Sequence, residues 1–134
     1  GDPDTARRFY TDGLDIARGL AQREPGNTGY QRDLSISYER LADLALRADD
    51  GATAAQDVQE ALTRRFSLVE REPSREDLRV ELAYTLFLAS FLGFTFGDDA
   101  RSAKQVVVEL LVPFDDAGRL GPRGRQLLAW ARGD

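Results

Sequence analysis

The stretch that decides the fold runs from residue 38 to residue 61 and reads YERLADLALRADDGATAAQDVQEA. Its apolar residues recur every three or four positions on both sides of the turn signal at 49–51, which predicts two consecutive helices. Ala42 and Ala54 are small residues at which two helices can approach closely, while larger side chains fill the space around them. The positions that set this pattern are Tyr38, Leu41, Ala42, Ala45, Ala54, Val58 and Ala61.

The same helical spacing continues through the rest of the chain, interrupted by Pro, Gly and Asp. Glu24-Pro25 and Glu72-Pro73 each end a helix, and Pro113 is expected to end another. Ser74 is expected to start a helix through a variant of the capping box. We therefore predict helices at 3–23, 28–47, 52–71, 75–96, 100–112 and from 121–122 onward, with a loop at 114–121 and no strand.

A shift of 48 residues superimposes much of this pattern on itself. It places Glu24-Pro25 on Glu72-Pro73, Leu34 on Leu82 and Val58 on Val106. The stretch at 38–61 resembles a tetratricopeptide repeat, which opens with an aromatic residue, Leu and a small residue and continues with Ala in its second helix. The usual unit has about 34 residues, so the chain resembles the extended-repeat variant found in large bacterial proteins.

This resemblance implies an all-α fold in which antiparallel helix pairs stack into a short right-handed solenoid of about six helices. Residues 1–134 are expected to form a single domain. Residues 3–23 would be the second helix of a truncated unit, 28–71 the first full unit, 75–112 a second and degenerate unit, and 113–134 a tail with a capping helix. We expect the chain to be a fragment of a larger bacterial multidomain protein, since Arg, Ala and Gly predominate as in GC-rich genomes.

Composition excludes several kinds of function. The 134 residues include no Cys and no His, which excludes a thiolate nucleophile, a Ser-His-Asp triad and zinc sites built from these residues. The net charge is −5 with both signs interspersed, so no basic cluster is present to bind nucleic acid. No apolar run is long enough for a membrane helix and no leader is recognisable. We expect a cytoplasmic protein without metal or cofactor.

The second predicted helix carries a polar face opposite its core stripe. In tetratricopeptide stacks the corresponding face lines the groove that takes peptides, so the resemblance implies a partner-binding site here. An ordinary solvated face with ion pairs between neighbouring turns accounts equally for the same residues. The candidates on this face are Arg32, Ile36, Glu39, Arg40, Asp43 and Arg47.

The fourth predicted helix is apolar on all sides, and a helix of this kind must be buried on several sides. Its candidates Tyr84, Phe87 and Phe91 could form an aromatic pocket for a partner helix or a small ligand, or the interface of a homodimer. Alternatively, the sixth helix folds back and covers them with Leu127, Leu128 and Trp130.

Paired carboxylates occur at 49–50, 98–99 and 115–116. Each pair falls in a predicted turn, where Asp caps a helix, so acid–base catalysis is not expected. The sequence therefore predicts a non-catalytic protein–protein interaction or scaffolding module that binds a protein or peptide. Homodimerisation through the fourth helix and sensing of a small molecule or peptide are the alternatives.

Overall fold

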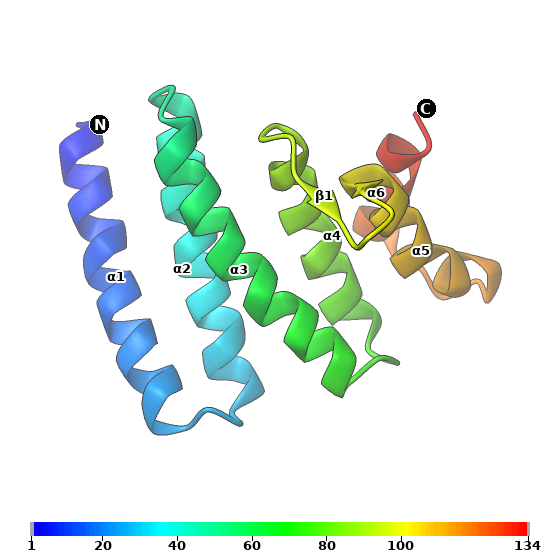
Figure 1. The fold of residues 1–134 in the computed structure, drawn as a ribbon. Helices are drawn as coiled ribbons and strands as arrows, with labels where there is room; N and C mark the ends of the chain where they lie inside the picture. Colours follow the sequence, from blue (N-terminus) through cyan, green and yellow to red (C-terminus); the bar gives the residue numbers. More distant parts are fainter. Residues whose placement is uncertain (1, 134) are drawn as a thin grey trace. The chain divides into compact units, whose positions relative to one another are not determined.

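The computed structural model describes residues 2–133 and confirms the all-α class within that range. Figure 1 shows the helices in chain order together with a very small hairpin. The elements are α1 (Pro3–Arg23), α2 (Thr28–Arg47), α3 (Gly51–Arg71), α4 (Glu76–Ser90), β1 (Thr95–Phe96), β2 (Arg101–Ser102), α5 (Ala103–Asp116) and α6 (Pro122–Ala131). The chain divides into two compact units, of which the first ends at Arg65 and the second begins at Phe66.

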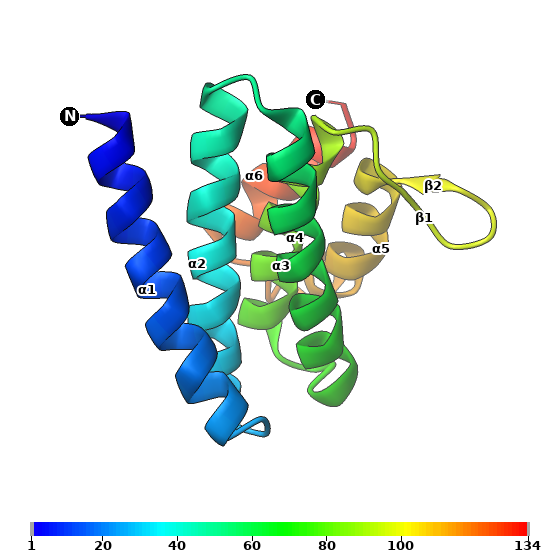
Figure 2. The ribbon, with the colours of Figure 1, turned by 60° about the vertical axis from the view of Figure 1, so that its left-hand side comes forward.

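The first unit contains α1 and α2, which run antiparallel and side by side (Figures 1 and 2), together with the first part of α3. Both helices begin where the sequence predicts. The Asp2 side chain accepts a hydrogen bond from the backbone N–H of Asp4 ahead of Pro3, and the Asn27 side chain accepts one from the N–H of Tyr30. These side chains satisfy N–H groups that the first helical turn leaves without a partner.

In the core of the first unit, small and medium side chains of α1, α2 and the first part of α3 pack against one another. Ala42, Ala54 and Ala61 are fully buried, as expected for positions of close helix approach. The cluster that joins α1 to α2 and α3 consists of Leu14, Ala17, Ala21, Leu34, Tyr38 and Ala61, with Tyr30 and Leu41 packed against it.

In the second unit, α4, α5 and α6 pack against one another. The helix α4 is buried on several sides, as its sequence predicts. Two polar contacts fix the ends of these helices: the Arg79 guanidinium donates to the backbone oxygen of Leu110 at 2.9 Å, and the N–H of Gly121 donates to the Glu76 carboxylate at 3.4 Å. The buried residues of α4 are Leu78, Val80, Leu82, Ala83, Thr85, Leu86, Leu88 and Ala89.

The predicted end of α4 near residue 96 is wrong. The helix ends at Ser90, and Gly93 adopts a positive φ of 73°, which an α-helix cannot contain. The chain then forms an antiparallel hairpin in which Thr95 pairs with Ser102 and Phe96 with Arg101. The predicted turn at 97–99 is present, but it forms the tip of this hairpin.

The bounds of α5 also differ from the prediction. Ala100 has a φ of 53°, so the helix starts only at Ala103, after the Ser102 cap. Pro113 lies inside the last turn and does not end the helix, which continues to Asp116. A proline costs one backbone hydrogen bond there, whereas the added turn buries Phe114. The expected loop at 114–121 is therefore shorter.

The capping box predicted at Ser74 is absent. Arg75 is the residue before α4, and it makes no side-chain cap; its guanidinium instead pairs with Asp77 at 2.7 Å. A capping box is present at α5, where the Ser102 hydroxyl accepts from the N–H of Gln105 and the Gln105 side chain accepts from the N–H of Ser102. Pro122 opens α6 as predicted.

Candidate protein-binding groove

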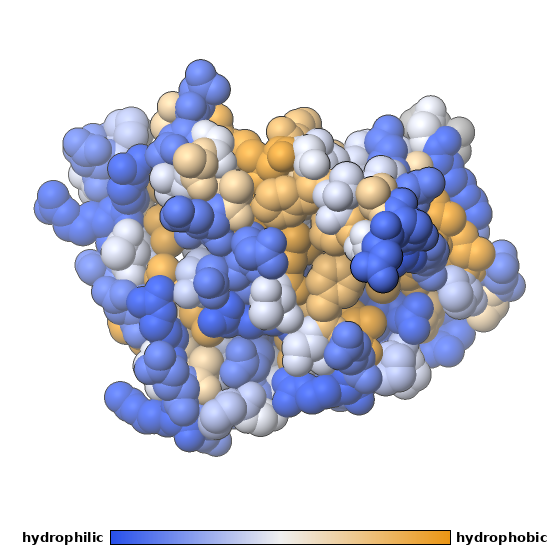
Figure 3. Space-filling model, viewed as in Figure 1, coloured by the Kyte–Doolittle hydropathy of each residue, from blue (hydrophilic) through white to orange (hydrophobic). Residues whose placement is uncertain are grey.

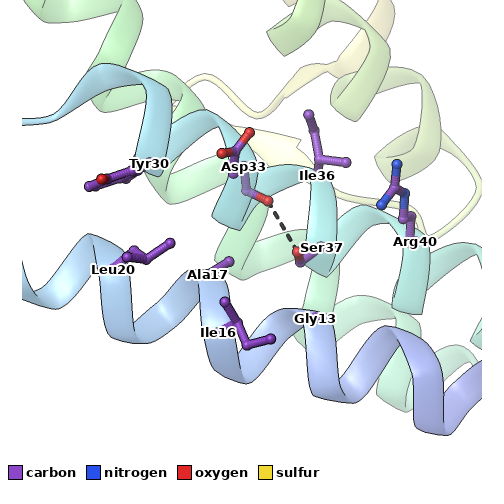
Figure 4. Close-up of a pocket in the computed structure, with 9 residues that line it drawn as sticks. All are labelled: Gly13, Ile16, Ala17, Leu20, Tyr30, Asp33, Ile36, Ser37 and Arg40. Carbon is purple, nitrogen blue, oxygen red and sulfur yellow. Dashed lines mark hydrogen bonds between the residues drawn. The ribbon is translucent and has the colours of Figure 1, made fainter.

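A groove of about 310 Å³ lies between α1 and α2 on the surface of the first unit. Figure 4 shows its lining side chains, which come from both helices; those from α1 are apolar, whereas α2 also contributes Asp33, Ser37 and Arg40. We call this surface the α1–α2 groove. Its lining residues are Gly13, Ile16, Ala17 and Leu20 from α1, and Tyr30, Asp33, Ile36, Ser37 and Arg40 from α2.

The α1 wall of the groove belongs to an apolar stripe that packing within the chain leaves open. Leu14 and Ala17 face the core, whereas Phe9 and Ile16 on the neighbouring stripe remain 72% and 67% exposed. Positions 9, 13 and 16 share one side of the helix because they are separated by four and three residues. Side chains of this size are normally buried, and two of them on one stripe mark a surface suited to an interaction.

Two oppositely charged side chains lie on the α2 side of the groove. Asp33 and Arg40 are both exposed on α2, and neither forms a salt bridge within residues 2–133. The Arg40 guanidinium lies 6.0 Å from the centre of the Tyr10 ring, and the Ser37 hydroxyl donates to the backbone oxygen of Asp33 at 3.1 Å. The α2 side of the groove therefore carries one negative and one positive side chain, seven residues apart.

The six residues predicted on the polar face of α2 do not form one surface. Ile36 and Arg40 line the groove, while Asp43 pairs with Arg47 across one helical turn at 3.0 Å. Glu39 was expected on the exposed face and is buried. Arg32 is half-buried on the same helix.

Glu39 is buried because α3 supplies a partner that the sequence pattern of α2 does not reveal. Its carboxylate accepts two hydrogen bonds from the Arg65 guanidinium, at 2.6 and 3.2 Å, and both side chains are less than one tenth exposed. A buried carboxylate requires a partner of this kind, because an unpaired charge would be very costly to remove from water. Glu39 consequently belongs to the core.

A second and more polar pocket, of about 550 Å³, lies around Tyr38 in the first unit. Arg18 donates to the Tyr38 hydroxyl at 3.0 Å, and the Arg64 guanidinium lies 5.1 Å from the ring centre. Sequence reasoning placed Tyr38 in the core and did not find this pocket. Both arginines already pair with neighbouring carboxylates, Arg18 with Asp15 and Arg64 with Glu60.

In the second unit, the aromatic residues predicted on the fourth helix, of which Phe91 follows the end of α4, contact one another in a row. The Phe87 ring lies 6.4 Å from Tyr84 and 5.1 Å from Phe91, and Trp130 of α6 packs edge-on against it at 5.0 Å. The sixth helix therefore contacts this face at Phe87 through Trp130. Phe91 remains 64% exposed.

One carboxyl group that the sequence did not single out has a shifted pKa. Partial burial, together with the nearby carboxylates Glu60 and Asp50, raises the pKa of Asp57 to about 6. The cause is first desolvation and then repulsion between like charges.

Within residues 2–133, no group of three or more acidic residues is placed to hold a metal ion. No helix in this range combines the length and the apolar character needed to cross a membrane. No family model matches the sequence, and comparisons with curated proteins and with solved structures gave no significant match.

Proposed function

We propose that this chain is a non-catalytic protein–protein interaction and scaffolding module, built on a tetratricopeptide-like plan within a larger bacterial cytoplasmic protein. The observation that carries this proposal is the α1–α2 groove, whose lining includes the exposed Ile16, together with the exposed Phe9 on the same stripe of α1. Removing such side chains from water favours association by about 1.5–3 kcal/mol for each one fully buried. The groove is open and elongated between two helices, a shape that accepts the apolar face of a third helix.

The alternatives from the sequence have less support. A homodimer through α4 would need its aromatic face, but Trp130 packs on Phe87 and leaves Phe91 as the exposed ring of that row. A small-molecule sensor would need an enclosed pocket beside these rings, whereas they pack on one another.

The proposal can be tested by selecting helix-forming peptides of random sequence on the immobilised protein. We expect enriched peptides to carry apolar residues three, four and seven positions apart, because that spacing forms one stripe of a helix. Binding should be lost in Ile16→Asp, which places a charge in the groove. The matched control is Phe91→Asp, which changes an equally exposed apolar residue in the second unit and should bind normally.

Circular dichroism of both variants would establish that the helices remain folded. Peptides that bind Ile16→Asp as tightly as the unchanged protein would place the interaction elsewhere. A selection that enriches no peptide, from either the unchanged protein or the control, would contradict the proposed function of the groove.

A further inference from the structure

We propose that the occupant of the α1–α2 groove is the same groove of a second copy of this chain. This inference rests on the proposed function and names the partner. The two copies would face each other across a two-fold axis that lies in the interface and runs perpendicular to the helices. Three features of the first unit carry the inference: the order of the charges on α2, the exposed apolar stripe on α1, and a glycine at its centre.

Because α1 and α2 are antiparallel and joined by a short turn, their connection determines which of their residues lie at the same level along the helix axis. The helices are joined by the short turn at 24–27, so residues equally far from that turn lie side by side. The contact of Arg40 with the Tyr10 ring, at 6.0 Å, is one such pair. By the same count, Gly13 lies level with Ser37, and both line the groove.

The two charged residues on the α2 side of the groove are arranged so that the surface complements itself. Asp33 and Arg40 are seven residues apart on α2, or about 10 Å along the helix axis at 1.5 Å per residue. A two-fold axis through their midpoint, near residues 36–37, exchanges the two positions. It therefore brings Asp33 of each copy opposite Arg40 of the other, as an interface between identical surfaces requires.

The same axis matches the apolar parts of the two surfaces. The midpoint of Asp33 and Arg40 lies level with Gly13 on α1, and Phe9 and Ile16 stand on either side of that glycine. The antiparallel arrangement places Phe9 of one copy within about 3 Å, measured along the helix axis, of Ile16 of the other. Each contact occurs twice, and all four exposed side chains become buried.

Gly13 allows the two α1 helices to come close. It lies in the middle of a long helix, where glycine is unfavourable relative to alanine by roughly 1 kcal/mol. A Cβ atom added there would meet nothing within 4 Å inside the same chain, so packing within one copy does not require a glycine. A close contact with a second helix at this position would require one, because a missing side chain lets two backbones approach.

An unrelated helix would need an acidic and a basic residue about two turns apart, with the right polarity, around a central apolar stripe. The second copy already carries this arrangement. A stable interface removes about 800 Å² from water on each partner.

The test uses sedimentation velocity of the full 134-residue chain over a range of concentrations, with charge-reversal variants. Asp33→Arg leaves a positive charge at both positions, and Arg40→Asp leaves a negative charge at both, so each variant alone should dimerise at least about tenfold more weakly. A mixture of the two variants restores opposite charges across the interface, and we expect it to form a heterodimer about as strong as the unchanged dimer. The matched control is Asp98→Arg, a charge reversal in the hairpin of the second unit, which should dimerise normally.

A steric variant tests the axis independently of charge. Gln favours the helix over glycine, and a Cβ atom at position 13 meets no atom within 4 Å inside one copy, so Gly13→Gln should fold at least as well as the unchanged protein. It should nevertheless dimerise at least about tenfold more weakly, because it places a side chain where the two α1 helices cross.

If the chain is a monomer at every concentration, this inference is contradicted, and the peptide selection then tests the proposed function by itself. If peptides then bind the groove, the proposed function stands and the partner is a different protein. If no peptide binds, both the partner and the proposed function are contradicted. A dimer that tolerates Gly13→Gln and both charge reversals would also overturn the inference, because its interface would lie on another surface. Weakened single variants with a restored mixture would support it.

Discussion

At the scale of single residues, the buried pair of Glu39 and Arg65 has the largest expected effect on stability. Two short hydrogen bonds join the side chains, and both are almost completely removed from water. The pair connects α2 to α3 within the first unit. Hydrophobic patterning assigns charged residues to the surface, so such a pair can be recognised only when the partner on the other helix is known.

We expect Glu39→Ala to destabilise the folded protein by about 3–5 kcal/mol, because it leaves the Arg65 guanidinium buried without its carboxylate partner. Replacing both residues by Met should recover most of this loss, since neither charge then needs a partner. Urea unfolding followed by circular dichroism measures the difference.

The control for this prediction is Asp43→Ala, which removes an exposed ion pair with Arg47 on the same helix and should cost less than about 1 kcal/mol. Equal losses for Asp43→Ala and Glu39→Ala would contradict the assigned burial of Glu39.

Asp57 predicts a pH dependence of stability. Its pKa rises from 3.8 to about 6 in the folded state, so the folded protein binds more protons than the unfolded chain between these values. The contribution of Asp57 to the free energy of unfolding is therefore fully present below pH 3.8 and is lost as the pH rises through about 6. Asp57→Asn should remove this fall and stabilise the protein at neutral pH by about 1 kcal/mol, after allowance for solvent screening.

Urea unfolding of the unchanged protein and Asp57→Asn at pH values between 4 and 8 tests this expectation. The exposed Asp12→Asn serves as the control and should keep the pH dependence of the unchanged protein. A stability difference between Asp57→Asn and the unchanged protein that stays constant with pH would refute the assignment.

At the scale of elements, the sequence predicts where helices exist better than where they begin and end. Both bounds of α1 and α2 follow from a capping side chain, a proline or a turn, all of which are local signals. The end of α4 and the start of α5 depend on residues 91–102. There the positive φ values of Gly93 and Ala100 and the pairing of β1 with β2 shape the backbone.

The two candidate capping boxes give a direct comparison. Ser102→Ala should destabilise the second unit by about 1 kcal/mol, because the hydroxyl accepts the N–H of Gln105 and nothing replaces it. Ser74→Ala should cost only a few tenths of 1 kcal/mol, since Arg75 precedes α4 without a side-chain cap. Thermal unfolding of the two variants side by side measures the difference, and a larger effect at Ser74 would show that α4 is capped by its hydroxyl.

At the scale of the whole molecule, the tetratricopeptide resemblance predicts one continuous stack, and that arrangement stays a prediction. Contacts group the chain into two units whose border lies inside α3, between Arg65 and Phe66. Each unit has its own core: Leu34 and Tyr38 contribute to the first, and Leu82 and Leu86 belong to the buried side chains of the second.

Dimerisation through the α1–α2 groove would couple stability to concentration. For a folded dimer that unfolds to two chains, each tenfold rise in protein concentration should raise the unfolding temperature by about 2–4 °C. Gly13→Gln should show this rise only at about tenfold or more higher concentrations, because it dimerises more weakly, although its helix is intrinsically more stable. Calorimetry at several concentrations measures this, and an unfolding temperature of the unchanged protein that is independent of concentration would argue against a stable dimer.

The sequence by itself determined the all-α class, the bounds of the first two helices and the small buried residues Ala42 and Ala54, because periodicity, caps and turn residues are local properties of the chain. It also placed Ile36 and Arg40 on the side of α2 that faces away from the core. The tertiary structure alone decided that Arg65 buries Glu39 and that Trp130 covers Phe87. It also decided that Phe9 and Ile16 stay exposed beside a groove. Each of these outcomes depends on which side chains a second helix brings close, and residues far apart in the sequence carry no local signal of that contact.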